Sequence, residues 1–236
     1  MNLLYTFFSC LIFAFANPAI ASAQDLPSMV DKYFFDTDPP HGALIFQQRQ
    51  SFEAVALRKV TGSFFTHVGI IRVTGGGPYV MQSSSETDGV EEVPMDEFIN
   101  AGTNQDFAIY VDAKDIRGYG HLNHPASEAA YDFYHLPYDR YLMPGTDAFY
   151  SAELIFELFK KVGHPIGEKT SLALLNRNQA ASLSTLFPDW QNHPVCKGNL
   201  LDEQMCLQRI GLQKIVIPDS LANDPKLRPF MTTYAN

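Results

Sequence analysis

The sequence of 236 residues lacks several features that mark large classes of protein. It contains no run of basic residues, and its net charge of −9 at pH 7 is opposite in sign to a surface that binds nucleic-acid phosphates. After Ala23, no apolar run is long enough to cross a bilayer. Internal repeats, low-complexity segments and clear linkers are also missing. With 46% hydrophobic and 18% charged residues, the composition predicts a single globular domain.

The N-terminal segment is the most apolar part of the sequence. An apolar core from Leu3 to Ala16 precedes Ala21-Ser22-Ala23, a small-x-small site in front of Gln24. This pattern predicts a secretory signal peptide over residues 1–23 and an exported mature protein, periplasmic or secreted. The segment before the apolar core carries no Lys or Arg, so an uncleaved N-terminal anchor remains the alternative.

Cysteine is scarce, with three residues in the whole chain. Cys10 lies in the predicted signal peptide, which leaves Cys196 and Cys206. In an exported protein, two cysteines close in sequence predict a disulfide that closes a short loop. Two free buried thiols are the alternative. Neither residue is a catalytic candidate, because Cys196 lies in a loop-like stretch and Cys206 has no histidine at a useful spacing.

The order of elements predicts an α+β domain over residues 24–236, with 191–236 as an appended C-terminal region. Short β-branched and aromatic runs predict strands at residues 43–48, 64–73, 78–84, 89–94 and 106–112. Apolar spacing predicts helices at residues 51–62, 95–102, 124–137 and from 151 onward. Ser51 is a candidate N-cap and Gly62 a candidate stop. Strands followed by helices favour an antiparallel sheet.

Two polar residues stand out on the predicted strands. His67 lies within "FTHVGII", and Gln82 ends the next strand arm, "PYVMQ". A hairpin between the two strands would bring these side chains together, since cross-strand neighbours can touch. A lone strand histidine is usually a satisfied core residue, and a polar strand-end residue usually lies in solvent.

Ser151 opens the predicted helix whose apolar stripe includes Leu154, Ile155 and Leu158. A serine at a helix start is most often an N-cap. The same position suits a nucleophile, because the free N–H groups and the positive dipole end can hold a developing oxyanion. A nucleophile at a helix start, opposite a strand-borne histidine with a polar partner, is the papain-like arrangement.

The chain resembles the YiiX family, a circularly permuted branch of the NlpC/P60 papain-like hydrolases. The resemblance starts at "HGALIFQQ" and runs through "VTGSFFTHVGIIRV", "PYVMQSSSETDGVEEVPMDEFI" and "LPYDRYLMPGTDAFYSAELIFELF". It implies a small antiparallel sheet flanked by helices. It also implies a chain order of histidine, polar residue and nucleophile, which His67, Gln82 and Ser151 meet. The family's Tyr-Asp pair corresponds to Tyr138 and Asp139, which we expect to bind substrate near the cleft.

Three positions depart from the family pattern. The motif that resembles Tyr-Cys-Ser-Glu-Leu reads Tyr-Ser-Ala-Glu-Leu, so Ser151 occupies the cysteine position. Gln82 replaces the usual acidic partner of the histidine, and Ala43 follows Gly42 where the family has Gly-Asp. A hydroxyl cannot ionise in the resting enzyme as a thiol can, so Ser151 would have to lose its proton to His67 during attack.

Two hypotheses follow from these residues. In the first, the protein hydrolyses amide or ester bonds of a cell-wall peptide or lipid-linked substrate. Ser151 is the nucleophile, His67 the base and Gln82 the orienting group, and the backbone N–H of Ser151 or Ala152 supplies part of the oxyanion hole. In the second, it is a pseudoenzyme that binds a peptide or acyl ligand in the same cleft.

Neither hypothesis needs a cofactor or a metal. His121 and His124 have His-x-x-His spacing, but no third ligand pattern lies nearby, so we interpret them as loop and helix-cap residues.

Overall fold

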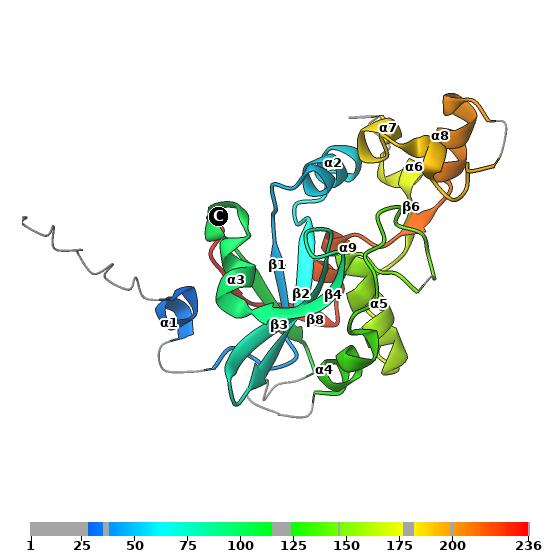
Figure 1. The fold of residues 1–236 in the computed structure, drawn as a ribbon. Coiled ribbons are helices and arrows are strands. Elements are labelled where there is room, and N and C mark those ends of the chain that lie inside the picture. Colours follow the sequence, from blue (N-terminus) through cyan, green and yellow to red (C-terminus); the bar gives the residue numbers. More distant parts are fainter. Residues whose placement is uncertain are drawn as a thin grey trace, which may run out of the picture.

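The computed structural model describes residues 28–34, 38–114, 124–145, 147–176, 182–198 and 201–235. The predicted signal peptide, Cys10 and His121 lie outside this part of the chain. A six-stranded sheet forms its centre, with every neighbouring pair antiparallel and the order β4-β3-β2-β1-β5-β8 (Figure 1). Its strands are β1 (Leu44–Gln47), β2 (His67–Thr74), β3 (Gly77–Ser84), β4 (Gly89–Pro94), β5 (Ala108–Asp112) and β8 (Leu227–Thr232).

Helices surround the sheet and extend the molecule at one end. They are α1 (Met29–Phe34), α2 (Phe52–Thr61), α3 (Met95–Asn100), α4 (Pro125–Ala129), α5 (Ser151–Lys161), α6 (Leu172–Leu175), α7 (Leu183–Leu186), α8 (Glu203–Gly211) and α9 (Pro218–Ala222). A two-stranded sheet pairs β6 (Thr170–Ser171) with β7 (Lys214–Ile215). Figure 1 shows α6, α7 and α8 gathered beyond α2. None of the helices in the described residues is long and apolar enough to span a membrane.

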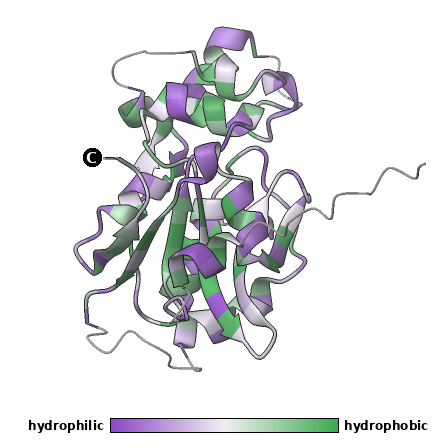
Figure 2. Ribbon diagram, turned by 90° about the vertical axis from the view of Figure 1, so that its left-hand side faces the viewer, coloured by the Kyte–Doolittle hydropathy of each residue, from purple (hydrophilic) through white to green (hydrophobic). Residues whose placement is uncertain are grey.

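Strand alternation gives the sheet two apolar faces, and each is covered by helices. One face, which includes Ile45 and Ile71, packs against Phe98 of α3. The opposite face, which includes Phe46 and Ile70, packs against Leu154 and other apolar residues of α5. Figure 2 shows the hydrophobic colour concentrated along the central strands between these layers. The antiparallel sheet flanked by helices is the fold class that the sequence predicts.

Helix α2 begins and ends where its sequence signals predict. The Ser51 hydroxyl accepts a hydrogen bond of 3.2 Å from the backbone N–H of Ala54. Gly62 ends the helix with a φ of 70°, a left-handed conformation that favours glycine, and its N–H donates to the Arg58 carbonyl at 2.8 Å. These two caps set where α2 begins and ends.

The C-terminal region is part of the main structure. The strand β8 pairs with β5 and forms one edge of the sheet, so residues 227–232 belong to the sheet instead of to an appendage. The structure joins Cys196 and Cys206 in a disulfide, with their Cα atoms 5.6 Å apart. This bond ties the turn after the short 3₁₀ helix Trp190–Asn192 to α8.

Candidate active site

A pocket opens at the end of the sheet where β2 begins, β3 ends and α5 begins. His67 is the first residue of β2, Ser84 the last of β3 and Ser151 the first of α5, and all three line the pocket. The walls of the pocket also include residues from the chain between β1 and α2, from the turn after β3 and from the stretch around Tyr138. The sheet therefore brings the predicted histidine and the predicted nucleophile to one cavity, although 84 positions separate them in the chain (151 − 67).

His67 and Gln82 form the hydrogen bond that the hairpin predicts. The His67 Nε2 atom lies 2.7 Å from the Gln82 Oε1 atom, and both side chains are buried. β2 and β3 pair antiparallel in this region, with Ile70 opposite Met81. Because successive side chains alternate between faces, His67 and Gln82 share one face of the sheet, where the His67 ring lies 5.6 Å from the ring of Phe98.

Arg49 is a site residue that the sequence reasoning missed. Its guanidinium is 5% exposed, lines the pocket and donates from Nη2 to Gln82 Oε1 at 2.8 Å. Its backbone N–H donates to the Thr66 hydroxyl at 2.8 Å, which ties it to the residue before His67. The sequence alone gives no signal for Arg49, because its place at the site depends on the strand pairing: Arg49 follows β1 by two residues, and Gln47, the last residue of β1, is paired with His67.

The surroundings of His67 favour the neutral imidazole. Burial lowers the pKa of His67 well below its ordinary 6.5, and the positive charge of Arg49 lowers it further. The hydrogen bond with Gln82 raises the pKa, but by less than burial and Arg49 lower it. A neutral ring keeps a lone pair on one nitrogen, so His67 can act as a proton acceptor across the neutral pH range.

Ser151 is a helix residue and does not cap α5, contrary to the usual role of a serine at a helix start. The N-cap is Tyr150, whose extended backbone (φ −93°, ψ 167°) precedes the first turn and whose side chain makes no capping bond. The first intrahelical bond runs from Leu154 N–H to the Tyr150 carbonyl at 3.0 Å. The N–H groups of Ser151 and Ala152 therefore precede the helical ladder, as an oxyanion hole requires. Although Ser151 and His67 both line the pocket, no hydrogen bond joins the Ser151 hydroxyl to the His67 ring.

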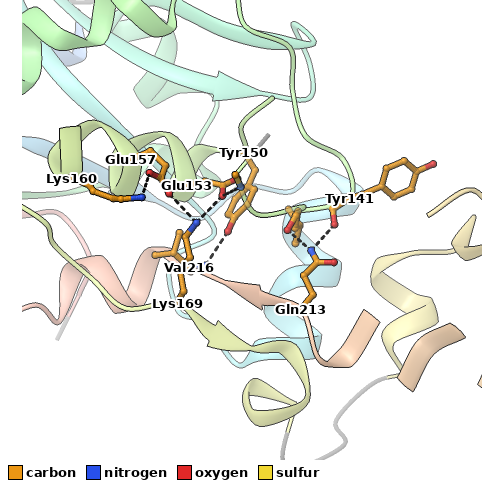
Figure 3. Close-up of polar contacts among 10 residues, drawn as sticks. Tyr141, Tyr150, Glu153, Glu157, Lys160, Lys169, Gln213 and Val216 are labelled. Atoms are coloured by element: carbon orange, nitrogen blue, oxygen red, sulfur yellow. Dashed lines mark hydrogen bonds and ion pairs between the residues drawn. The ribbon is translucent and has the colours of Figure 1, made fainter. Parts of the chain in front are cut away.

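Polar contacts hold the start of α5 against two segments that follow it in the chain, at Lys169 and at Val216 (Figure 3). The Tyr150 hydroxyl accepts a hydrogen bond of 2.9 Å from the backbone N–H of Val216. Glu153, which is fully buried, forms an ion pair of 3.0 Å with Lys169. Burial raises the pKa of Glu153, and the hydrogen bond and charge of Lys169 counteract that rise. These contacts fix the residues on both sides of Ser151 without occupying its hydroxyl.

Of the pair Tyr138 and Asp139, only Tyr138 lines the pocket. Tyr138 lines the pocket, and burial raises the pKa of its phenol above the ordinary value of 10.0. Asp139 is buried and does not line the pocket; its Oδ1 accepts from the backbone N–H of Tyr141 at 2.9 Å. Burial raises the pKa of Asp139 to about 6. Substrate contact remains a prediction for Tyr138, whereas Asp139 is placed to shape the turn behind it.

Among the described residues, no three His, Cys, Asp or Glu side chains gather in a way that could hold a metal ion. Of the two histidines with His-x-x-His spacing, His124 lies directly before α4, with its ring 6.2 Å from that of Phe159.

Comparisons with known proteins agree with this arrangement. A family profile described as permuted papain-like amidase enzyme, YaeF/YiiX, C92 family, matches residues 38–230. The chain belongs to the YaeF/YiiX family of permuted papain-like amidases. This membership confirms the resemblance that the sequence motifs indicate, and it supports a papain-like amidase or related hydrolase.

A solved structure shows the fold that the YaeF/YiiX family shares. The crystal structure of metalloprotein yiiX from Escherichia coli O157:H7 matches with a TM-score of 0.66 and 18% sequence identity. The match covers 84% of this chain and 99% of the yiiX chain. At this identity the likeness supports the fold and not the chemistry. A search of curated proteins found no match.

Proposed function

We propose that the protein is an exported hydrolase of amide or ester bonds that uses Ser151 as nucleophile, His67 as base and Gln82 as the orienting group. The observation that carries this proposal is the buried His67–Gln82 hydrogen bond of 2.7 Å. His67 lines the same pocket as Ser151. The family's amidase description supports the reaction class. The N-terminal sequence of residues 1–23 supports export.

The proposed reaction has two halves. His67 keeps its Nε2 proton in a hydrogen bond donated to Gln82 Oε1. It accepts the Ser151 hydroxyl proton at Nδ1, while the serine oxygen attacks the substrate carbonyl carbon. The N–H groups of Ser151 and Ala152 stabilise the oxyanion. When the tetrahedral intermediate collapses, His67 returns its proton to the leaving amine or alkoxide. Water then attacks the acyl-serine by the same route and releases the acid.

The geometry of the free protein shapes this reaction. No hydrogen bond joins Ser151 to His67 in the free protein, so this contact has to form when the substrate binds. The imidazolium that forms during attack touches an amide instead of a carboxylate, and the Arg49 cation opposes its charge. We therefore expect a slow hydrolase whose base is fully available at neutral pH.

The proposed substrates are cell-wall peptides and lipid-linked amides or esters, a class that export and the family's amidase description support. The pocket offers hydrogen-bonding side chains, among them the Tyr138 phenol and the Thr66 hydroxyl. These groups suit the polar part of such a substrate next to the scissile bond.

A specific observation favours a second candidate, a pseudoenzyme that binds a peptide or acyl ligand. By the motif resemblance, Ser151 occupies the position of the family's cysteine. The neighbouring Arg49 disfavours the charged histidine that proton transfer creates. Both features weaken catalysis and leave the pocket intact.

Labelling with a fluorophosphonate distinguishes the two candidates. The mature protein would be treated over a range of pH, with Ser151→Ala and His67→Ala as controls. A hydrolase would label only when both residues are present, and labelling would rise with pH as His67 loses its proton below pH 6.5. A folded protein that does not label refutes the hydrolase and supports the pseudoenzyme.

A further inference from the structure

The side-chain amide of Gln82 is held at both ends by charged groups. Its Oε1 atom accepts from Arg49 Nη2 at 2.8 Å and lies 2.7 Å from His67 Nε2. Its Nε2 atom donates to Glu91 Oε1 at 3.1 Å. Glu91 comes from β4, where it is the direct cross-strand partner of Gln82. Arg49 comes from the segment after β1, so three different parts of the chain meet at this amide.

The chemistry of these partners determines which end of the amide is oxygen. A guanidinium can only donate hydrogen bonds, and an ionised carboxylate can only accept them. The end of Gln82 that meets Arg49 must therefore be the carbonyl oxygen, and the end that meets Glu91 must be the NH₂ group. His67 shares the oxygen end, so its Nε2 must carry a proton and donate it. The lone pair of the neutral ring is then on Nδ1.

We propose that Arg49 and Glu91 are positioning residues that set the tautomer of His67 by orienting Gln82. Neither forms a hydrogen bond with the histidine ring. A carboxylate in place of Gln82 would present an acceptor in either rotation, whereas an amide offers a donor at one end and an acceptor at the other. An amide at this position therefore needs external groups to orient it, and this chain supplies one at each end.

The other groups around Arg49 allow the orientation of the Gln82 amide to be tested apart from the loss of a carboxylate near Arg49. Glu86 lies 3.6 Å from Arg49 Nη1, with its side chain 57% exposed, and Ser84 Oγ lies 3.4 Å from the same nitrogen. Neither forms a hydrogen bond with the Gln82 side chain, whose partners are Arg49, His67 and Glu91. A Glu86→Gln variant therefore removes a carboxylate beside Arg49 and leaves both ends of the amide held, which makes it a matched control for Glu91→Gln.

The tautomer can be measured directly by nitrogen NMR of the histidine rings at neutral pH. The full mature protein would be labelled with ¹⁵N-histidine, and His67→Ala would assign the signal. We expect His67 to show one protonated nitrogen, Nε2, in the wild type and in Glu86→Gln. In the double variant Arg49→Met with Glu91→Gln, we expect this single form to be lost and two exchanging tautomers to appear.

Two results would overturn the proposal. One is a spectrum of the wild-type protein that shows the His67 proton on Nδ1; this result would decide the matter without any variant. The other is a folded double variant that keeps the single Nε2–H form. The catalytic meaning of the tautomer rests on the proposed hydrolase. The labelling rate of the double variant does not test the tautomer, because Arg49→Met also removes a cation that opposes the charged His67 ring. The NMR readout needs no activity, so a protein with the expected tautomer and no labelling refutes the hydrolase alone.

Discussion

The ion pair between Glu153 and Lys169 gives the sharpest stability prediction. Glu153 is fully buried two residues after Ser151, and Lys169 reaches it at 3.0 Å from the segment before α6. The perturbation is Lys169→Met, which keeps the length and apolar stem of the side chain and removes its charge. Within the described residues, the buried Glu153 carboxylate then retains the 3.4 Å contact with the Gly145 N–H, and its Oε2 atom has no partner there. The variant also removes the 3.0 Å pair between Lys169 and Glu157, which keeps its pair with Lys160.

The expected cost follows from leaving that charge unpaired. Removing one partner of a buried pair typically costs about 3–5 kcal/mol. Because the Lys169 side chain is 20% exposed, we expect the low end, about 3 kcal/mol. The matched control is Lys160→Met on α5, which removes the 2.8 Å pair with Glu157. The Lys160 side chain is 59% exposed, and such surface pairs are worth about 0–1 kcal/mol.

Urea denaturation at two pH values tests both the magnitude and its origin. Burial raises the pKa of Glu153, and loss of Lys169 should raise it further. A carboxyl whose folded pKa is raised destabilises the fold above that pKa, and the penalty disappears as the pH falls below the unfolded pKa. The variant should therefore lose more stability at pH 7 than at pH 4.5.

Two outcomes would refute this reasoning. One is a loss in Lys169→Met no larger than that in Lys160→Met. The other is a loss that does not depend on pH. A double variant, Lys169→Met with Glu153→Gln, should recover most of the stability, because it removes the buried charge itself.

Three further predictions concern the site and its support. A Ser151→Cys variant should carry a thiol with a pKa near the ordinary value of about 8.5, because burial and the neighbouring cation keep His67 neutral. The rate of alkylation of this thiol, measured against pH, gives its pKa, and an inflection below about pH 6 would contradict the prediction. Reduction of the Cys196–Cys206 disulfide, with a sequence separation of 10, should lower the free energy of unfolding by about 3 kcal/mol in urea denaturation; a change below about 1 kcal/mol would argue against the loop-entropy account. Since the pKa of Asp139 is raised to about 6, stability should fall as the pH rises from about 4 to 6, and Asp139→Asn should remove that slope; an unchanged slope would assign it to another group.

Local signals in the sequence predict the parts of the fold that local chemistry determines. The helix caps Ser51 and Gly62 lie where their residue types indicate, since one side chain and one backbone conformation suffice for each. The contact between His67 and Gln82 follows from strand alternation and a hairpin. The family motifs place these residues in a permuted papain-like fold before any coordinates are considered.

Other features depend on contacts that no short window of sequence contains. Arg49 reads as an isolated basic residue until β1 pairs with β2 and brings it beside Gln82. The strand β8 contains Pro229 and is mostly exposed, so neither alternation nor burial marks it, and its pairing with β5 comes from the tertiary fold. Helices of one turn, such as α6 and α7, are too short for apolar periodicity. The N-cap of α5 is Tyr150, one residue before the serine whose type suggests a cap, because Tyr150 keeps the extended backbone that precedes the helix.

The permuted chain order has a consequence for how the site assembles. The strands β1 to β5 lie between residues 44 and 112, and their contacts are mostly between neighbours in sequence. β5 gains its second partner only when Thr232 pairs with Ala108, 124 positions earlier. Because local contacts form fastest, we expect the histidine and its orienting groups to assemble first, and Ser151 to arrive later with α5. During that interval β5 is an open strand edge, so slow synthesis or truncation before residue 227 would favour aggregation over completion of the active site.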